Sequence, residues 1–291
     1  LASSKGRNGG IALKRVLTIQ DISCLGKCSL TIALPVISAL GAETVILPTA
    51  VLSTHTMFKN FTVFDLSSQI VPITEHWKSE AVKFDAIYTG YLGSFEQIAM
   101  VEKIFDDFGS EQTLRFIDPV MADNGKLYPA FDKAYAKRNA ELCGHADIIV
   151  PNITEACFMT DTEYKEEYDE AYIKTLLEKL AALGPKIAVL TGVSLSAGKT
   201  GFMGLDTSTG EFGSYQNDRV SASYHGTGDL FASVCVGCMM AGVDWQTALR
   251  IASDYTAHTI KVTLENPAKP WYGVDFEKTL PDLMETMKQL S

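Results

Sequence analysis

Tyr224-His225-Gly226-Thr227-Gly228-Asp229-Leu230 is followed by an apolar run that extends from Phe231 to Met240. Glycines on both sides of a threonine predict a tight loop, and the apolar run predicts a buried helix that begins directly after it. The first turn of such a helix carries free backbone N–H groups and about half a positive charge, which together attract an anion. The junction is therefore a candidate phosphate-binding loop.

Asp229 gives this loop a second property. A carboxylate repels phosphate, so its presence favours a further role, in which Asp229 takes the proton of a hydroxyl group that attacks the phosphate. The alternative is a simple glycine turn in which Asp229 caps its own helix. Short glycine motifs are weak signals, and both interpretations stay open on this stretch alone.

Length and composition limit the class of protein. The chain has 291 residues, 46% of them hydrophobic, and a net charge of −10. The acidic balance argues against nucleic-acid binding, and no apolar run reaches membrane-spanning length. Residues 1–10 are polar and rich in Ser and Gly, without the apolar core of a signal peptide. We expect a disordered arm over residues 1–14 and a single domain over residues 15–291.

The six cysteines do not indicate disulfides in a chain of this length and apolar content. Cys24 and Cys28 form one closely spaced pair, and Cys235 and Cys238 form another. The second pair lies inside the apolar helix expected after the glycine loop, where zinc ligands would lack their usual turn. Buried thiols in a reducing, cytoplasmic setting are the better interpretation.

Strand-like and helix-like segments alternate along the chain. This pattern predicts a three-layer α/β/α fold with a mostly parallel central sheet, in which ligands bind beyond the carboxyl ends of the strands. Loops are expected over residues 21–28 and 51–60. The expected strands are 15–20, 44–47, 85–89, 114–118, 147–150 and 186–191, with a hairpin over 200–215; the expected helices are 29–40, 94–108, 172–183, 228–240 and 245–262.

Two common nucleotide-binding signatures do not fit. No G-x-G-x-x-G follows the first expected strand, so a dinucleotide oxidoreductase is disfavoured. Gly198-Lys199-Thr200 resembles the end of a P-loop, but Val193 stands where that motif requires its first glycine. The stretch also precedes an expected hairpin instead of a helix.

Two further motifs follow expected strands. Asp118-Pro119 places a carboxylate at one strand end, and Pro151-Asn152-Ile153-Thr154-Glu155 follows the next strand and opens a helix. Carboxylates at such positions suit Mg²⁺, which keeps several waters and takes few protein ligands. The alternative for Asn152 and Glu155 is a capping box. Together with the Gly-Thr-Gly-Asp loop downstream, the motifs favour a phosphotransferase.

These motifs carry a family resemblance. The opening LTIQ, STHT at 53–56, TGYLGS at 89–94, DPVMAD at 118–123, PNITE at 151–155 and GTGDLF at 226–231 occur in the order seen in the ribokinase-like superfamily. Within it, the chain resembles the pyridoxal/pyridoxamine kinases of vitamin B6 salvage, over roughly residue 15 to the C-terminus. The resemblance implies ATP-dependent phosphorylation of the 5′-hydroxymethyl group of a B6 vitamer, a homodimer, and a cytoplasmic location.

The resemblance also implies roles for individual residues. Asp229 would be the catalytic base, and the backbone N–H groups of Gly226, Thr227 and Gly228 would form the anion hole. Mg²⁺ would lie near Asp118 and Glu155, held largely through water. A monovalent cation is common in the superfamily, and the sequence leaves that requirement open. Positions around ATP are Asp118, Val150, Asn152, Glu155 and Thr191; positions around the pyridine ring are Asp21, His55, Thr56 and Tyr91.

Asp21 departs from the family pattern, in which a serine usually follows the first-strand Ile-Gln and touches the substrate. A carboxylate accepts hydrogen bonds, does not donate them, and favours a cationic partner. Asp21 would therefore mildly favour pyridoxamine. The alternative is that Asp21 faces the loop and caps the helix region at Ser29.

Three other functions remain open. Hydroxymethylpyrimidine kinases of the same superfamily usually carry cysteine at the position of Asp229. Sugar kinases usually open with a Gly-Gly motif and an added strand pair, and neither stands between Thr18 and Thr44. A non-catalytic B6-binding or nucleotide-binding protein is the third alternative, and the intact Asp229 argues against it.

Overall fold

The computed structural model describes residues 13–290, so most of the expected arm over residues 1–14 lies outside the described residues. A nine-stranded sheet forms its middle layer. A two-stranded ribbon, β6 (Ala122–Asp123) and β7 (Lys126–Leu127), lies outside that sheet. The strands of the large sheet are β1 Arg15–Leu25, β2 Glu43–Thr54, β3 Val63–Asp65, β4 Ala86–Thr89, β5 Leu114–Ile117, β8 Ile148–Ile149, β9 Ile187–Val193, β10 Lys199–Asp206 and β11 Phe212–Asp218.

The strand order is β11-β10-β9-β8-β5-β4-β1-β2-β3. The strands from β2 to β9 in this order run parallel to their neighbours, while β3, β10 and β11 pair antiparallel at the two edges. Parallel strands place their carboxyl ends along one edge of the sheet, which is where ligands bind in this architecture.

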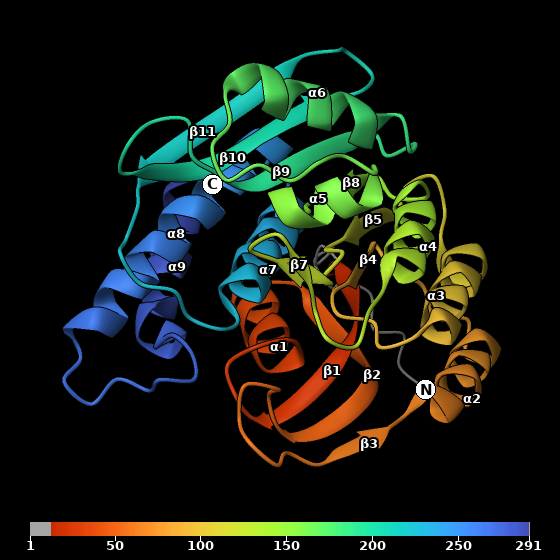
Figure 1. Cartoon of the computed structure of the whole chain (residues 1–291). Helices are drawn as coiled ribbons and strands as arrows, with labels where there is room; N and C mark the ends of the chain where they lie inside the picture. Colours follow the sequence, from red (N-terminus) through yellow and green to blue (C-terminus); the bar gives the residue numbers. More distant parts are fainter. Residues whose placement is uncertain (1–12, 291) are drawn as a thin grey trace, which may run out of the picture.

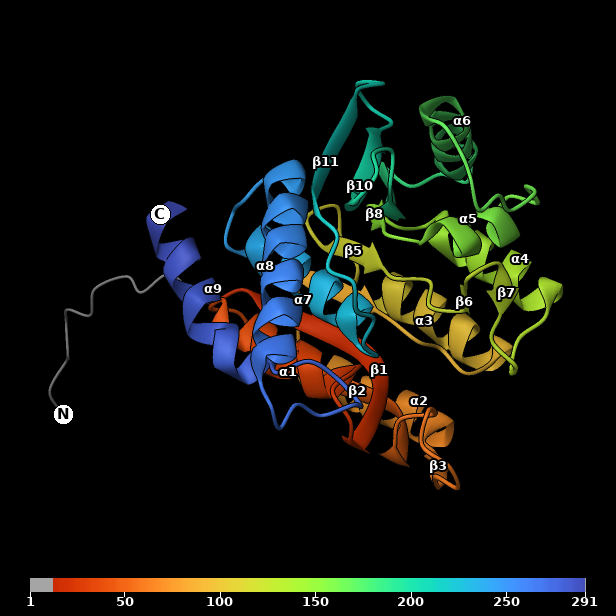
Figure 2. The ribbon, with the colours of Figure 1, turned by 60° about the vertical axis from the view of Figure 1, so that its left-hand side comes forward.

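Helices cover both faces of the sheet (Figures 1 and 2). Side chains of α2 to α6 form one core with one face of the sheet, and side chains of α1, α7, α8 and α9 form the second core with the other face. The helices are α1 Leu30–Ala39, α2 Ser67–Ser79, α3 Phe95–Phe108, α4 Lys133–Cys143, α5 Ile153–Met159, α6 Glu170–Ala181, α7 Thr227–Met240, α8 Trp245–Glu265 and α9 Phe276–Leu290.

The two cores follow from the alternation of side chains along each strand. In β1, Leu17 and Ile19 belong to the core under α2 to α6, whereas Val16 belongs to the core under α7 and α8. All three side chains are fully buried. Because both faces of the inner strands are covered, these strands consist of nearly continuous apolar residues.

The three-layer fold with its mostly parallel sheet is confirmed, and the expected hairpin is present as β10 and β11. Two expected loops are wrong in part. β1 runs on to Leu25 and β2 to Thr54, because the two strands stay paired beyond an irregularity between Gln20 and Ile22. Asp21 therefore lies within a strand, and this tertiary pairing overrides the turn-like local composition.

The expected elements also omitted the helices α2, α4 and α9. Helices α2 and α9 each contain a proline, Pro72 and Pro281, and each buries only a narrow stripe of side chains. No helix in the described part of the chain is long and apolar enough to cross a membrane.

Candidate active site

The Gly226 loop meets the first turn of α7 at the centre of the candidate site. Gly226 is the N-cap residue and has φ 83. A Cβ at this position would lie 1.8 Å from the carbonyl oxygen of Lys27, so only glycine fits here. The amides of Gly226, Thr227 and Gly228 donate no hydrogen bond to any described residue. The helix therefore begins with free donors, as an anion-binding site requires.

Asp229 does not cap α7, so the capping interpretation is wrong: the N-cap is Gly226, and no side chain caps this helix end. The side chain of Asp229 is half-buried. Burial raises the pKa of Asp229 to about 7, against the lowering effect of the Ser29 backbone amide, and the charge of Asp21 raises it further. A carboxyl group with such a pKa can accept a proton near neutral pH.

Asp118 and Glu155 lie beyond the ends of β5 and β8. Burial raises the pKa of both groups. The charges of Glu155 and Asp229 raise the pKa of Asp118 further. Glu155 accepts backbone hydrogen bonds from Met121 at 3.0 Å and from Asn152 at 2.9 Å. The Asp118 carboxylate accepts no hydrogen bond from any described residue, which leaves its oxygens available.

Asn152 and Glu155 form the expected capping box at the start of α5. The Asn152 side chain also donates to the carbonyl oxygen of Ala122 at 2.8 Å. Thr191 pairs with Asn152 in an isolated parallel bridge, and its hydroxyl donates to Pro151 at 3.3 Å. Val150 is buried in the core between the sheet and the helices α1, α7, α8 and α9. The fold thus brings together four of the five positions expected near ATP, and Asp118 is the fifth.

Asp21 connects the expected ring-binding positions. It is 6% exposed. Its negative charge raises the pKa of His55, of Tyr91 and of Asp229. Its pKa is raised by burial, although hydrogen bonds from the hydroxyls of Ser29 and Ser23 lower it. Asp21 on β1 therefore lies within electrostatic range of His55 at the end of β2, of Tyr91 after β4 and of Asp229 in the first turn of α7.

His55 is buried, and its neutral tautomer is determined by two contacts. Its Nδ1 accepts a hydrogen bond from the backbone amide of Met57 at 3.3 Å. The ring hydrogen therefore lies on Nε2, which donates a hydrogen bond to the carbonyl oxygen of Tyr272 at 3.0 Å. Burial lowers the pKa of His55. The adjacent Thr56 is exposed, and its side chain makes no hydrogen bond to a described residue.

Sequence reasoning missed the aromatic residues around His55. The ring of His225 lies 4.3 Å from that of His55, and Phe58 contacts Trp271 and Tyr272. Burial, together with the charge of His55, lowers the pKa of His225 to about 4. The position of His225 directly before Gly226 was the one available signal, whereas Trp271 and Tyr272 lie in a late loop with no recognisable motif.

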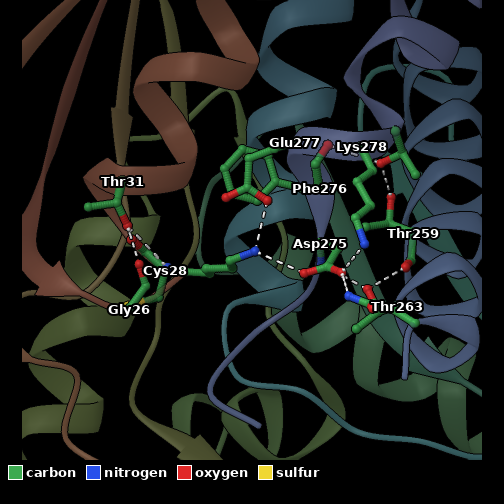
Figure 3. Close-up of polar contacts among 12 residues, drawn as sticks. Gly26, Cys28, Thr31, Thr259, Thr263, Asp275, Phe276, Glu277 and Lys278 are labelled. Carbon is green, nitrogen blue, oxygen red and sulfur yellow. Dashed lines mark hydrogen bonds and ion pairs between the residues drawn. The ribbon is translucent and has the colours of Figure 1, made fainter. Parts of the chain in front are cut away.

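The same late loop is joined to the loop before α1 by ion pairs. Lys27 Nζ contacts Asp275 at 3.2 Å and Glu277 at 2.8 Å, and its ammonium group lies over the ring of Phe276. Figure 3 shows that Asp275 also forms an ion pair with Lys278. Because the backbone of Lys27 itself packs against Gly226, the cluster holds the residue that adjoins the Gly226 loop.

Replacing Lys27 with methionine should lower the free energy of unfolding by about 1–3 kcal/mol. Asp275 is 7% exposed at its side chain and would lose one of its cations, although Lys278 remains. Lys14→Met is a matched control, since Lys14 pairs with Asp85 at the surface, and its effect should be about 0–1 kcal/mol. Urea unfolding of both variants measures the difference, and equal losses would contradict a supporting role for Lys27.

Cys24 is exposed, and the five other cysteines are buried as free thiols. Within residues 13–290, no group of three or more His, Cys, Asp or Glu side chains converges as a metal site.

Comparison with known proteins gives consistent matches. The profile of the phosphomethylpyrimidine kinase family matches residues 33–270. The pyridoxal kinase of Sus scrofa is 30% identical over 246 residues, which cover 78% of this chain and 75% of the relative.

Two solved structures superpose closely. A Bacteroides thetaiotaomicron protein, assigned provisionally as a phosphomethylpyrimidine kinase and solved in a crystal form with pyridoxal, has a TM-score of 0.88 and 35% identity over 93% of this chain and 96% of its own. The pyridoxal kinase of Lactobacillus plantarum has a TM-score of 0.86 and 30% identity, over 96% of this chain and 99% of its own.

Proposed function

This chain belongs to the phosphomethylpyrimidine kinase family of the ribokinase-like superfamily, and on that premise we propose that it phosphorylates the 5′-hydroxymethyl group of a vitamin B6 vitamer with ATP. The observation that carries the proposal is the first turn of α7, where free amides and a carboxyl group of pKa about 7 lie side by side. An anion hole and a general base are the two components that transfer of a phosphoryl group to an alcohol requires.

In this reaction Asp229 accepts the proton of the substrate hydroxyl as its oxygen attacks the γ-phosphorus in line. The amides of Gly226, Thr227 and Gly228 donate to the γ-phosphoryl oxygens, and the positive end of the α7 dipole favours the charge that collects there. Gly228 is exposed, and a Cβ would meet nothing within 4 Å, so a phosphoryl group can approach closely.

The vitamer ring would lie against Tyr91 and His55. Tyr91 packs its ring 5.4 Å from that of Phe131, which holds it in place. Thr56 would contribute through its backbone or through a change of side-chain position, because its side chain is exposed. The carboxylate of Asp21 would accept a hydrogen bond from a cationic group of the substrate.

The residues present fit a magnesium ion. Asp118 is a buried carboxylate without a hydrogen-bond donor among the described residues, and it faces two further acidic groups, Glu155 and Asp229. Such a concentration of negative charge is stabilised by a cation. When bound, Mg²⁺ would neutralise phosphate charge, with Asp118 as the nearest ligand and Glu155 acting through water. Asn152, Val150 and Thr191 would lie along the nucleotide.

Hydroxymethylpyrimidine is the second candidate substrate, because the matching family profile is named for phosphomethylpyrimidine kinase, whose substrate carries a related pyrimidine ring. A coupled ADP-release assay with pyridoxal, pyridoxamine, pyridoxine and hydroxymethylpyrimidine, together with a sugar, separates the candidates. We expect ADP release with at least one B6 vitamer to exceed release with the other compounds. Release with hydroxymethylpyrimidine alone, or with none of them, would overturn the proposal.

Asp21→Ser tests the vitamer preference. If Asp21 contacts a cationic amine, the change should lower kcat/KM for pyridoxamine more than for pyridoxine, by about tenfold or more, since a hydrogen bond to a charged group contributes about 1.5–3 kcal/mol. Steady-state kinetics with both substrates provide the measurement. An equal loss with both, or no loss, would assign Asp21 a purely structural role.

A homodimer and a cytoplasmic location complete the proposal. Both are inferred from the family resemblance, and sedimentation of the purified protein tests the first.

A further inference from the structure

Trp271 is an exposed aromatic residue in the loop between α8 and α9. It is 59% exposed, and its indole N–H donates no hydrogen bond to any described residue. Single exposed apolar residues are common on protein surfaces, so exposure alone assigns no role to Trp271. The surroundings of its loop therefore decide what the side chain does.

Hydrogen bonds hold the loop around Trp271 in place. The carbonyl oxygen of Tyr272 accepts a hydrogen bond from Nε2 of His55 at 3.0 Å, and the amide of Asp275 donates to the hydroxyl of Thr263 at 2.8 Å. A loop that is already ordered loses little conformational entropy when a ligand binds. The exposed indole is thus presented on a prearranged backbone.

The same loop adjoins the phosphate-binding loop through Lys27. A Cβ on Gly273 would lie 2.5 Å from Cβ of Lys27, and a Cβ on Gly226 would lie 1.8 Å from the carbonyl oxygen of Lys27. Lys27 therefore lies between the two loops. In Figure 2 the loop between α8 and α9 reaches towards the ends of β1 and β2. The backbone that carries Trp271 thus lies beside the anion-hole amides.

An aromatic cluster of His55, Phe58, His225 and Trp271 joins this loop to the expected ring-binding positions. The ring of Trp271 lies 4.4 Å from that of Phe58 and 6.0 Å from that of His55. Both nitrogens of His55 are hydrogen-bonded within the protein, and the residue is 1% exposed. His55 therefore has no polar atom to offer a vitamer, and Trp271 is the exposed member of the cluster.

We propose that Trp271 is a specificity-determining residue whose indole stacks on the pyridine ring of the vitamer. The inference rests on the proposed function. An indole and a flat heteroaromatic ring attract each other through offset stacking and dispersion, which do not depend on one particular substituent of the ring. The contact should therefore select a heteroaromatic substrate over a sugar and contribute similarly to the binding of pyridoxal, pyridoxamine and pyridoxine.

Trp271→Leu and Trp271→Phe form the test, with pyridoxine as the probe because it has no aldehyde that reacts with lysine. Leucine keeps an apolar side chain and removes the aromatic face, so KM for pyridoxine should rise about three- to tenfold. Phenylalanine keeps an aromatic face, so KM should stay within about twofold of the wild type. In both variants kcat and KM for ATP should change little, since the lost contact is a binding contact with the vitamer.

Phe212→Leu is the matched control. Phe212 is 39% exposed and pairs with Leu205, which pairs with Ala188 near the start of β9, at the edge of the sheet opposite the candidate site. KM for pyridoxine should be unchanged in this variant. If Trp271 only stabilised its loop, Trp271→Leu would instead lower the melting temperature and kcat without a selective rise of KM for pyridoxine.

Binding of pyridoxine without ATP gives a readout that needs no turnover. Isothermal titration calorimetry should show the same three- to tenfold rise of Kd in Trp271→Leu, about the scale of one stacking contact. Pyridoxine should also quench the tryptophan emission of the wild type, and Trp271→Phe should lose most of this quenching while it still binds. The quenching experiment decides the question even if Trp271→Leu is insoluble.

An unchanged KM for pyridoxine in Trp271→Leu, an equal rise in Phe212→Leu, or full quenching in Trp271→Phe would overturn the inference. A changed sedimentation coefficient of Trp271→Leu with an unchanged KM would also overturn it, because Trp271 would then be a contact between copies of the chain. In each of these cases wild-type turnover upholds the kinase. Absence of wild-type turnover with every vitamer would instead overturn the proposed function.

Discussion

Asp229→Asn should lower kcat by about 10²–10⁴-fold, the usual contribution of a general base. Asparagine retains the size of aspartate and most of its capacity to accept hydrogen bonds, but it cannot take a proton at neutral pH. KM for ATP should change little, because the anion hole consists of backbone amides that stay in place. Steady-state kinetics at saturating vitamer and ATP test both expectations.

The stability of the Asp229→Asn variant provides the second measurement. The folded-state pKa of Asp229, about 7, lies above the ordinary aspartate value of 3.8. A raised carboxyl pKa means that ionisation costs stability as pH rises from about 4 through 7, so Asn should equal or exceed the wild type in melting temperature at pH 8. This difference should vanish near pH 4.

Near-normal turnover together with a lowered melting temperature would contradict the mechanism and move the search for a base to Asp21 or His55. The wild-type enzyme should also lose kcat as pH falls below about 7, because the protonated Asp229 can no longer act as a base.

Gly226→Ala should have the second large effect, on stability as well as on activity. Alanine is strained at φ 83, and its Cβ would lie 1.8 Å from the carbonyl oxygen of Lys27, a backbone atom that can move only with its loop. We expect the free energy of unfolding to fall by about 2–5 kcal/mol. Phosphoryl transfer should fall as well, since the shifted loop withdraws the anion-hole amides.

Gly228→Ala is the matched comparison, because its Cβ would meet nothing within 4 Å and its φ is not positive. Its stability should remain near that of the wild type or rise slightly, as alanine favours helices. Urea unfolding of both variants tests the expectation. A Gly226→Ala variant as stable as Gly228→Ala would show that the loop adapts to a side chain at either position.

The family, the three-layer fold and the kinase class were all predictable from the sequence. Asp118 and Asn152 could be assigned to one edge of the sheet because parallel strands end together. The course of the chain after β1 was not predictable, since residues 21–28 contain glycine and serine and suggest a loop. Pairing with β2 extends the strand through Asp21. The roles of the individual site residues stay proposals.

Contacts between distant residues were likewise beyond prediction. His55 bonds to Tyr272, which lies 217 residues away, and Lys27 bonds to Asp275, which lies 248 residues away. Neither Tyr272 nor Asp275 stands in a recognisable motif. A single sequence also does not indicate which lysine side chain will be largely buried in the folded chain. The loop around Trp271 therefore became part of the site only in the folded chain.

The sequence by itself determined the elements of the reaction: a glycine loop at a helix start, an aspartate in its first turn, and acidic residues at strand ends. These are local patterns, in which backbone conformation and helix geometry follow from neighbouring residues. Only the tertiary structure decided that burial raises the pKa of Asp229 to about 7 and that Asp229 does not cap its helix. The physical reason is that burial and hydrogen bonds set a pKa, and both depend on residues that meet only when the sheet and its helices pack together.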